Sequence, residues 1–102
     1  MEINVQQLKK RLDEGDKSFV FLDVREPHEY AEFNLGAKLI PLGTIPTAVA
    51  TELDGLQDEE IIIHCRSGVR SGQAQQFLLQ MGFTKVYNVT GGVVAWINNF
   101  GA

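Results

Sequence analysis

The chain has 102 residues, of which 44% are hydrophobic and 22% charged, and its formal net charge is −4. This length predicts one domain over residues 1–102 with an ordinary soluble composition. The acidic balance argues against nucleic acid and anionic membranes as partners. The single cysteine excludes an internal disulfide and a cysteine-rich zinc site, and it favours a reducing, cytoplasmic location. No apolar run reaches the roughly 18 residues of a membrane span, and the first residues do not read as a secretory signal.

The first third of the chain predicts two helices around a strand. Asn4 is a candidate N-cap, with Gln7 placed to complete a capping box, and Gly15 ends the first helix. The β-rich apolar run that follows predicts a strand buried on both faces. A proline suits the first position of the short helix after it. The expected ranges are a helix over Val5–Leu12, a strand over Ser18–Val24 and a helix over Pro27–Phe33.

The rest of the chain alternates between strands and helices. We expect strands over 38–41, 60–65 and 85–89, and helices over 45–53, over 71–81 and from Gly92 through Ile97. The helix over 71–81 should bury one face made of Ala74, Phe77, Leu78 and Met81, and Gly82 should end it. This alternation predicts an α/β sandwich on a parallel sheet, in which ligands bind outside the carboxyl ends of the strands.

The segment Cys65–Ser71 joins the clearest strand to the clearest helix. A tight strand-to-helix turn directs backbone N–H groups into a shared concavity, and Gly68 permits the conformations that this turn needs. Arg66 and Arg70 add two positive charges. These features lower the pKa of a thiol, so Cys65 is a candidate nucleophile rather than a small buried hydrophobe that ends a strand.

Histidine is a weaker candidate for activating the thiol. His64 precedes Cys65 in an extended strand, so its side chain should point to the opposite face of the sheet. We interpret His64 as a structural histidine with satisfied ring nitrogens, and His28 as a surface residue. Activation by backbone amides, the helix dipole and arginine is the better account.

Four short motifs, in this order, resemble the rhodanese family along the whole chain. They are Leu22-Asp23-Val24-Arg25-Glu26 with Glu29-Tyr30, then Ile40-Pro41-Leu42, then Cys65-Arg66-Ser67-Gly68-Val69-Arg70-Ser71, and Gly91-Gly92-Val93-Val94-Ala95-Trp96. The resemblance implies a rhodanese-like three-layer α/β sandwich with a five-stranded, mainly parallel sheet flanked by helices. It also implies that Cys65 accepts a sulfane sulfur and carries it as a persulfide, without a metal or an organic cofactor.

The resemblance assigns roles to the residues around Cys65. Arg66, Ser67, Gly68, Val69 and Arg70 would line the pocket, with both arginines available for an anionic donor such as thiosulfate. Asp23, Arg25 and Ser71 would support the residues that line the pocket. Two of them have a structural alternative: Arg25 could pair with Glu29, and Asp23 could hold a loop. The glycines Gly91 and Gly92 should permit close helix packing beside the active loop, and Trp96 should lie in the core.

Two departures from common patterns refine the expected chemistry. Residues 33–37 replace a longer Gly-His-Ile-Pro-Gly-Ala segment, as in rhodanese domains attached to enzymes that adenylylate sulfur carriers, which favours a protein acceptor. Related phosphatases place five residues between cysteine and arginine, whereas four separate Cys65 from Arg70. The smaller ring suits a single sulfur better than a phosphoryl group, so phosphatase activity is disfavoured.

The sequence therefore predicts a monomeric sulfurtransferase with a ping-pong mechanism. A thiol, cyanide or a sulfur-carrier protein would accept the sulfur, because the chain has no second cysteine to do so. A persulfide relay module loaded only by a protein donor, and a non-catalytic binding module of the same fold, are the alternatives.

Overall fold

A single parallel sheet organises the computed structural model, which describes residues 1–102. Its strands are β1 (Glu2–Ile3), β2 (Val20–Asp23), β3 (Lys38–Leu39), β4 (Glu60–His64) and β5 (Lys85–Val89). Their order in the sheet is β1-β5-β4-β2-β3, and every neighbouring pair is parallel. The sequence pattern did not predict β1, because two residues are too few to show a strand period.

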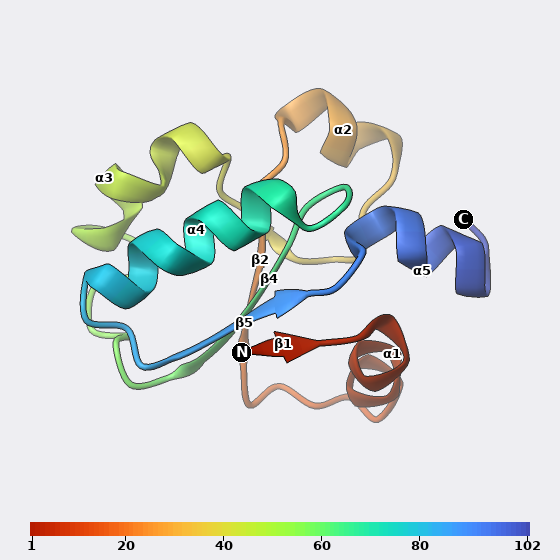
Figure 1. The fold of residues 1–102 in the computed structure, drawn as a ribbon, viewed down its shortest axis with the longest axis horizontal. Coiled ribbons are helices and arrows are strands. Elements are labelled where there is room, and N and C mark those ends of the chain that lie inside the picture. Colours follow the sequence, from red (N-terminus) through yellow and green to blue (C-terminus); the bar gives the residue numbers. More distant parts are fainter.

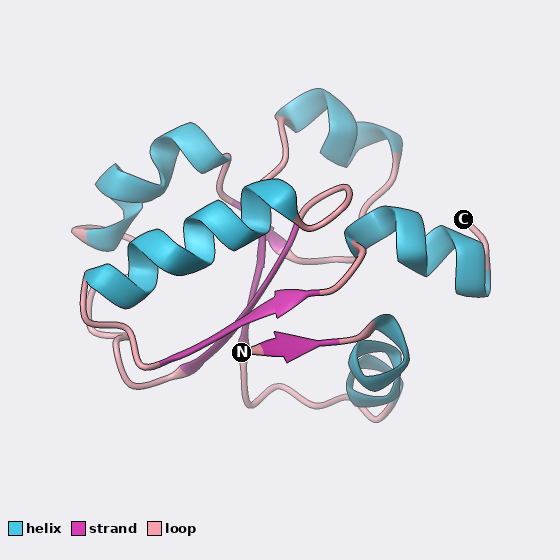
Figure 2. Ribbon diagram, in the orientation of Figure 1, coloured by secondary structure: helices cyan, strands magenta, loops and turns pink.

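Helices cover both faces of this sheet, as Figures 1 and 2 show. They are α1 (Val5–Asp13), α2 (Pro27–Glu32), α3 (Ile45–Val49), α4 (Val69–Gln80) and α5 (Gly92–Phe100), with a 3₁₀ turn over Leu42–Thr44. Buried residues of α3 and α4 pack on one face, whereas α1 and α5 pack on the other. The predicted three-layer α/β sandwich is confirmed. None of the helices has the length and apolar character that crossing a membrane requires.

The central strand β4 explains why both faces need cover. Ile61 and Ile63 point into the larger core, which contains residues of α3 and α4, while Ile62 points into the smaller core beside α1. All three side chains are fully buried. A strand with apolar residues at successive positions is stable only when helices remove both of its faces from water.

Helix ends agree with the sequence where a cap defines them. The capping box is present: Asn4 accepts from the N–H of Gln7, and Gln7 accepts from the N–H of Asn4. Met81 was wrongly placed on the buried face of α4. This helix ends at Gln80, so Met81 lies beyond its last turn and is 49% exposed. The helices α3 and α4 also differ from prediction, ending at Val49 and beginning at Val69.

The amino terminus of α5 rests on the end of β4. The N–H of Val93 donates to the carbonyl oxygen of Cys65 at 3.0 Å, and that of Val94 donates to Arg66 at 2.9 Å. A Cβ on Gly92 would lie only 2.3 Å from the Cys65 oxygen, and Gly92 has a φ of +53°. The expected close approach at Gly92 is confirmed. Trp96, expected in the core, is half-buried and packs against the smaller cluster.

We predict that Gly92→Ala lowers the free energy of unfolding by about 3 kcal/mol. The reason is that alanine would be strained in a left-handed backbone conformation and its Cβ would overlap the Cys65 carbonyl. Urea denaturation measures this loss. Gly43→Ala is the matched control, because a Cβ there meets no atom within 4 Å and its φ is not positive. Equal stability of the two variants would contradict the role given to Gly92.

Candidate functional site

The sulfur of Cys65 lies at the start of the loop between β4 and α4. Gly68 has a φ of +103° and directs its N–H to Cys65 Sγ at 3.1 Å. The Ser71 hydroxyl lies 3.3 Å from the same sulfur. Cys65 is 1% exposed and belongs to the larger core, so these donors reach an almost fully buried sulfur. The carbonyl oxygens of Cys65 and Arg66, at the start of the loop, accept hydrogen bonds from α5.

The ring of donors makes the thiol acidic. Burial alone raises the pKa of Cys65, but hydrogen bonds from the Ser71 hydroxyl and from the amides of Ser71, Gly68 and Ser67 outweigh it. The pKa of Cys65 is therefore below its ordinary value. A lowered pKa favours the thiolate, which is the reactive form of a cysteine.

Asn88 belongs to this network, although the sequence analysis did not select it. Its side-chain amide donates to the carbonyl oxygen of Gly68 at 3.0 Å, and its oxygen accepts from the Ser71 hydroxyl at 2.6 Å. Ser71 has a single proton, so Asn88 and the Cys65 sulfur share one donor. The available signal was an amide side chain near the carboxyl end of β5, an otherwise largely apolar strand.

His64 faces away from Cys65, as predicted, and is fully buried. Its Nε2 lies 3.6 Å from Asp23 Oδ2, and its ring packs against Phe21 with centroids 5.4 Å apart. The expectation of satisfied ring nitrogens was wrong: neither nitrogen has a hydrogen-bond partner. Burial lowers the pKa of His64, although Asp23 opposes that shift. Burial thus favours the neutral form of this histidine.

Asp23 and Arg25 form a buried unit next to the loop. Arg25 Nη2 donates to Asp23 Oδ2 at 2.8 Å and to the carbonyl oxygen of Phe33 at 2.7 Å. Asp23 is level with His64 in the sheet register, so the pair lies beside the end of β4. The suggested ion pair between Arg25 and Glu29 was wrong, because the Asp23 carboxylate binds Arg25 instead. Asp23 and Arg25 thus hold the loop that follows β2 in place.

Glu29 binds Arg70 instead. Arg70 donates through Nη1 and Nη2 to the two carboxylate oxygens of Glu29, at 2.6 and 2.9 Å. This hydrogen bond lowers the pKa of Glu29 to about 2 and raises that of Arg70. The expectation that both arginines are available for an anionic donor needs correction, since a carboxylate already occupies Arg70.

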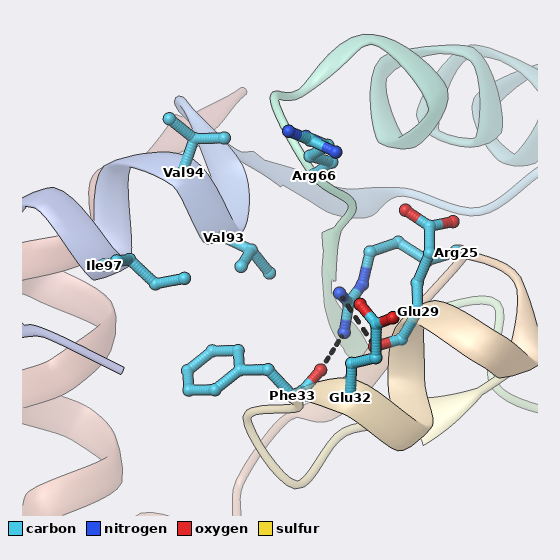
Figure 3. Close-up of a pocket in the computed structure, with 8 residues that line it drawn as sticks. All are labelled: Arg25, Glu29, Glu32, Phe33, Arg66, Val93, Val94 and Ile97. Carbon is cyan, nitrogen blue, oxygen red and sulfur yellow. Dashed lines mark hydrogen bonds between the residues drawn. The ribbon is translucent and has the colours of Figure 1, made fainter.

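A pocket of about 200 Å³ opens beside the loop, between α2 and α5 (Figure 3). It is lined by Arg25, Glu29, Glu32, Phe33, Arg66, Val93, Val94 and Ile97. Arg66 is exposed and has no ion pair, and it is the only residue of the loop that lines the pocket. Ser67 and Val69 are exposed outside it. Half of the lining residues are apolar, so the pocket can hold both a charged group and a carbon skeleton.

We predict that Ser71→Ala raises the pKa of Cys65 and lowers the thiolate fraction at pH 7 several-fold, because a hydrogen bond to the charged form is lost. The ultraviolet absorbance of the thiolate, titrated against pH, measures this change, and the single cysteine makes the signal unambiguous.

Ser67→Ala is the matched control. The hydroxyl of Ser67 has no hydrogen bond to the sulfur, and only its backbone amide contributes. An unchanged titration midpoint in Ser71→Ala would show that its hydroxyl does not stabilise the thiolate.

Comparisons with known proteins agree with this geometry. The rhodanese-like domain family matches residues 4–99. A sulfurtransferase of Allochromatium vinosum is 35% identical over 93% of this chain and 86% of its own. A putative sulfur carrier protein of Bacillus subtilis is 40% identical over 93% of this chain, which spans half of that protein. The crystal structure of a Staphylococcus aureus rhodanese-like domain protein has 36% identity and a TM-score of 0.80, covering 94% of this chain and 91% of that one. The chain therefore belongs to the rhodanese-like domain family, which includes sulfurtransferases.

Proposed function

We propose that this protein, acting through one domain over residues 1–102, transfers sulfane sulfur through a persulfide on Cys65. The Cys65 thiolate attacks the outer sulfur of a donor, thiosulfate for example. The S–S bond of the donor breaks, sulfite leaves with the electron pair of that bond, and Cys65 retains the outer sulfur as a persulfide anion. A total charge of −3 is conserved in this step, and no external oxidant or reductant takes part.

The second half-reaction returns the enzyme to its first state. A thiophilic acceptor attacks the outer sulfur of the persulfide, and the Cys65 thiolate leaves. Cyanide, a thiol or a sulfur-carrier protein can accept the sulfur. The chain has no second cysteine, so the acceptor comes from another molecule. We further propose a cytoplasmic setting, in which the thiol stays reduced between turnovers.

The observation that carries this proposal is the ring of donors around the sulfur. The N–H of Gly68 at 3.1 Å and the hydroxyl of Ser71 at 3.3 Å stabilise negative charge on Cys65. Preorganised donors of this kind lower the barrier to a step that forms an anion. Two features argue against a phosphoryl group as substrate. The spacing from Cys65 to Arg70 is short, and Glu29 already binds Arg70, so this arginine is not free to bind a phosphoryl group.

A persulfide relay with a protein donor is the second candidate function. The half-apolar pocket beside Cys65 favours it, because thiosulfate has no carbon atoms to place against Val93 and Ile97. The relative named as a putative sulfur carrier supports the same direction. Rapid loading by a persulfidated cysteine desulfurase, with slow turnover of thiosulfate, would favour this relay.

We predict that incubation with a sulfane donor adds one sulfur atom to the wild-type chain, and that cyanide removes it. Intact-mass spectrometry measures both steps. Cys65→Ser should gain no sulfur, because a serine hydroxyl is not ionised at neutral pH.

Ser67→Ala serves as the folded control and should still gain one sulfur, since its hydroxyl does not contact the thiol. Equal sulfur content in wild type and Cys65→Ser would overturn the proposed function. A non-catalytic binding module would give the same result in both proteins.

A further inference from the structure

Three arginines lie in or beside the Cys65 loop, and the protein's own carboxylates neutralise two of them. Asp23 binds Arg25, and Glu29 binds Arg70. Arg66 alone has no ion pair, and Glu32 lines the same pocket without a cationic partner. Positive and negative side chains around the site are thus equal in number, so the pocket has no surplus charge to attract a dianion.

The Glu29–Arg70 pair connects α2 to the first turn of α4. Both carboxylate oxygens bind the two terminal nitrogens of the guanidinium, at 2.6 and 2.9 Å. The backbone N–H of Glu26 also donates to Glu29 Oε1 at 3.0 Å, which holds the carboxylate in place. A bidentate pair uses the same fork of donors that an incoming oxyanion would need. Arg70 is therefore occupied before any donor arrives.

We propose that Glu29 is a specificity-determining residue that occupies Arg70 and so favours persulfide donors over thiosulfate. This inference rests on the proposed function of Cys65. Thiosulfate carries two negative charges and presents three oxyanion atoms that a free Arg70 would bind. A persulfide, R–S–SH or its anion, carries at most one charge on its sulfur and needs no such clamp.

The reaction with a persulfide balances without a further reagent. The Cys65 thiolate attacks the terminal sulfur of R–S–SH, and the bond between the two donor sulfurs breaks. The thiolate R–S⁻ leaves with that electron pair, and Cys65 becomes a persulfide that keeps the proton. The carbon skeleton of R has apolar residues to contact in the pocket, among them Phe33, Val93 and Ile97.

Glu29→Gln tests this role, because glutamine keeps the size of the side chain and removes its charge. We expect the KM for thiosulfate to fall about five- to tenfold, since Arg70 becomes free to bind the dianion. The kcat with thiosulfate should change less than about twofold. Kinetic parameters with glutathione persulfide, a small donor, and with persulfidated cysteine desulfurase, a protein donor, should also change less than about twofold.

Two further variants separate specificity from structure. Glu32→Gln removes a carboxylate from the same pocket without releasing an arginine, so its effect on the thiosulfate KM should be smaller than that of Glu29→Gln. The double variant Glu29→Gln with Arg70→Gln restores the charge balance and should return the KM to near the wild-type value. If the single variant does not fold, the double variant still tests the proposal: a several-fold higher KM there would mean that Arg70 already binds the donor in the wild type.

An unchanged or raised thiosulfate KM in Glu29→Gln would overturn the specificity role. Equal losses of kcat with all donors would overturn it too, because they indicate a structural contact only. The rates at which glutathione persulfide and persulfidated cysteine desulfurase add sulfur to wild-type Cys65 show whether a small or a protein donor is preferred. If any donor adds sulfur to wild-type Cys65, the proposed function stands. A contrary result with Glu29→Gln then counts against the specificity role alone.

Discussion

Two hydrogen bonds from the start of α5 determine the shape of the site. The amides of Val93 and Val94 bind the carbonyl oxygens of Cys65 and Arg66, so these carbonyl groups are satisfied by α5. The N–H groups that follow are then free to converge on the sulfur. This arrangement requires helix and loop to approach more closely than a Cβ would allow, which Gly92 makes feasible. The conformation of the Cys65 loop therefore depends on packing between the last helix and the central strand.

Ion pairs within the protein determine the net charge near the Cys65 loop. An acidic chain that places three arginines around one thiol would be expected to bind small anions. Asp23 and Glu29 remove most of that attraction by binding two of the arginines. The groups that lower the pKa of Cys65 are neighbouring backbone amides and one hydroxyl rather than a surplus of positive side chains. The groups that lower the pKa of Cys65 are thus different from those that set the net charge around it.

Local sequence signals predicted most of the fold, because caps, glycines and apolar runs act over a few residues. The capping box at Asn4 and the turn at Gly68 are of this kind. Pairings between distant segments were not predictable. Glu29 meets Arg70 across 41 positions, and Asn88 reaches the loop from β5. Arg25 and Glu29 are only four positions apart, and this short spacing favoured the wrong pair, because the buried Asp23 carboxylate binds the same guanidinium.

The burial of the Cys65 sulfur has a consequence for how a transferred sulfur atom would be exposed to a partner. In the unloaded protein only 1% of this residue reaches the surface, and thiol oxidation generally follows exposure. A sulfur bonded to Sγ extends the side chain by about 2 Å, the length of one S–S bond. In the proposed persulfide, the outer atom would be the one within reach of a partner, while the inner atom would stay enclosed. Enclosure of the inner sulfur in this proposed persulfide would direct an acceptor to the terminal sulfur, so that the acceptor would take up that sulfur and would not form a mixed disulfide with Cys65.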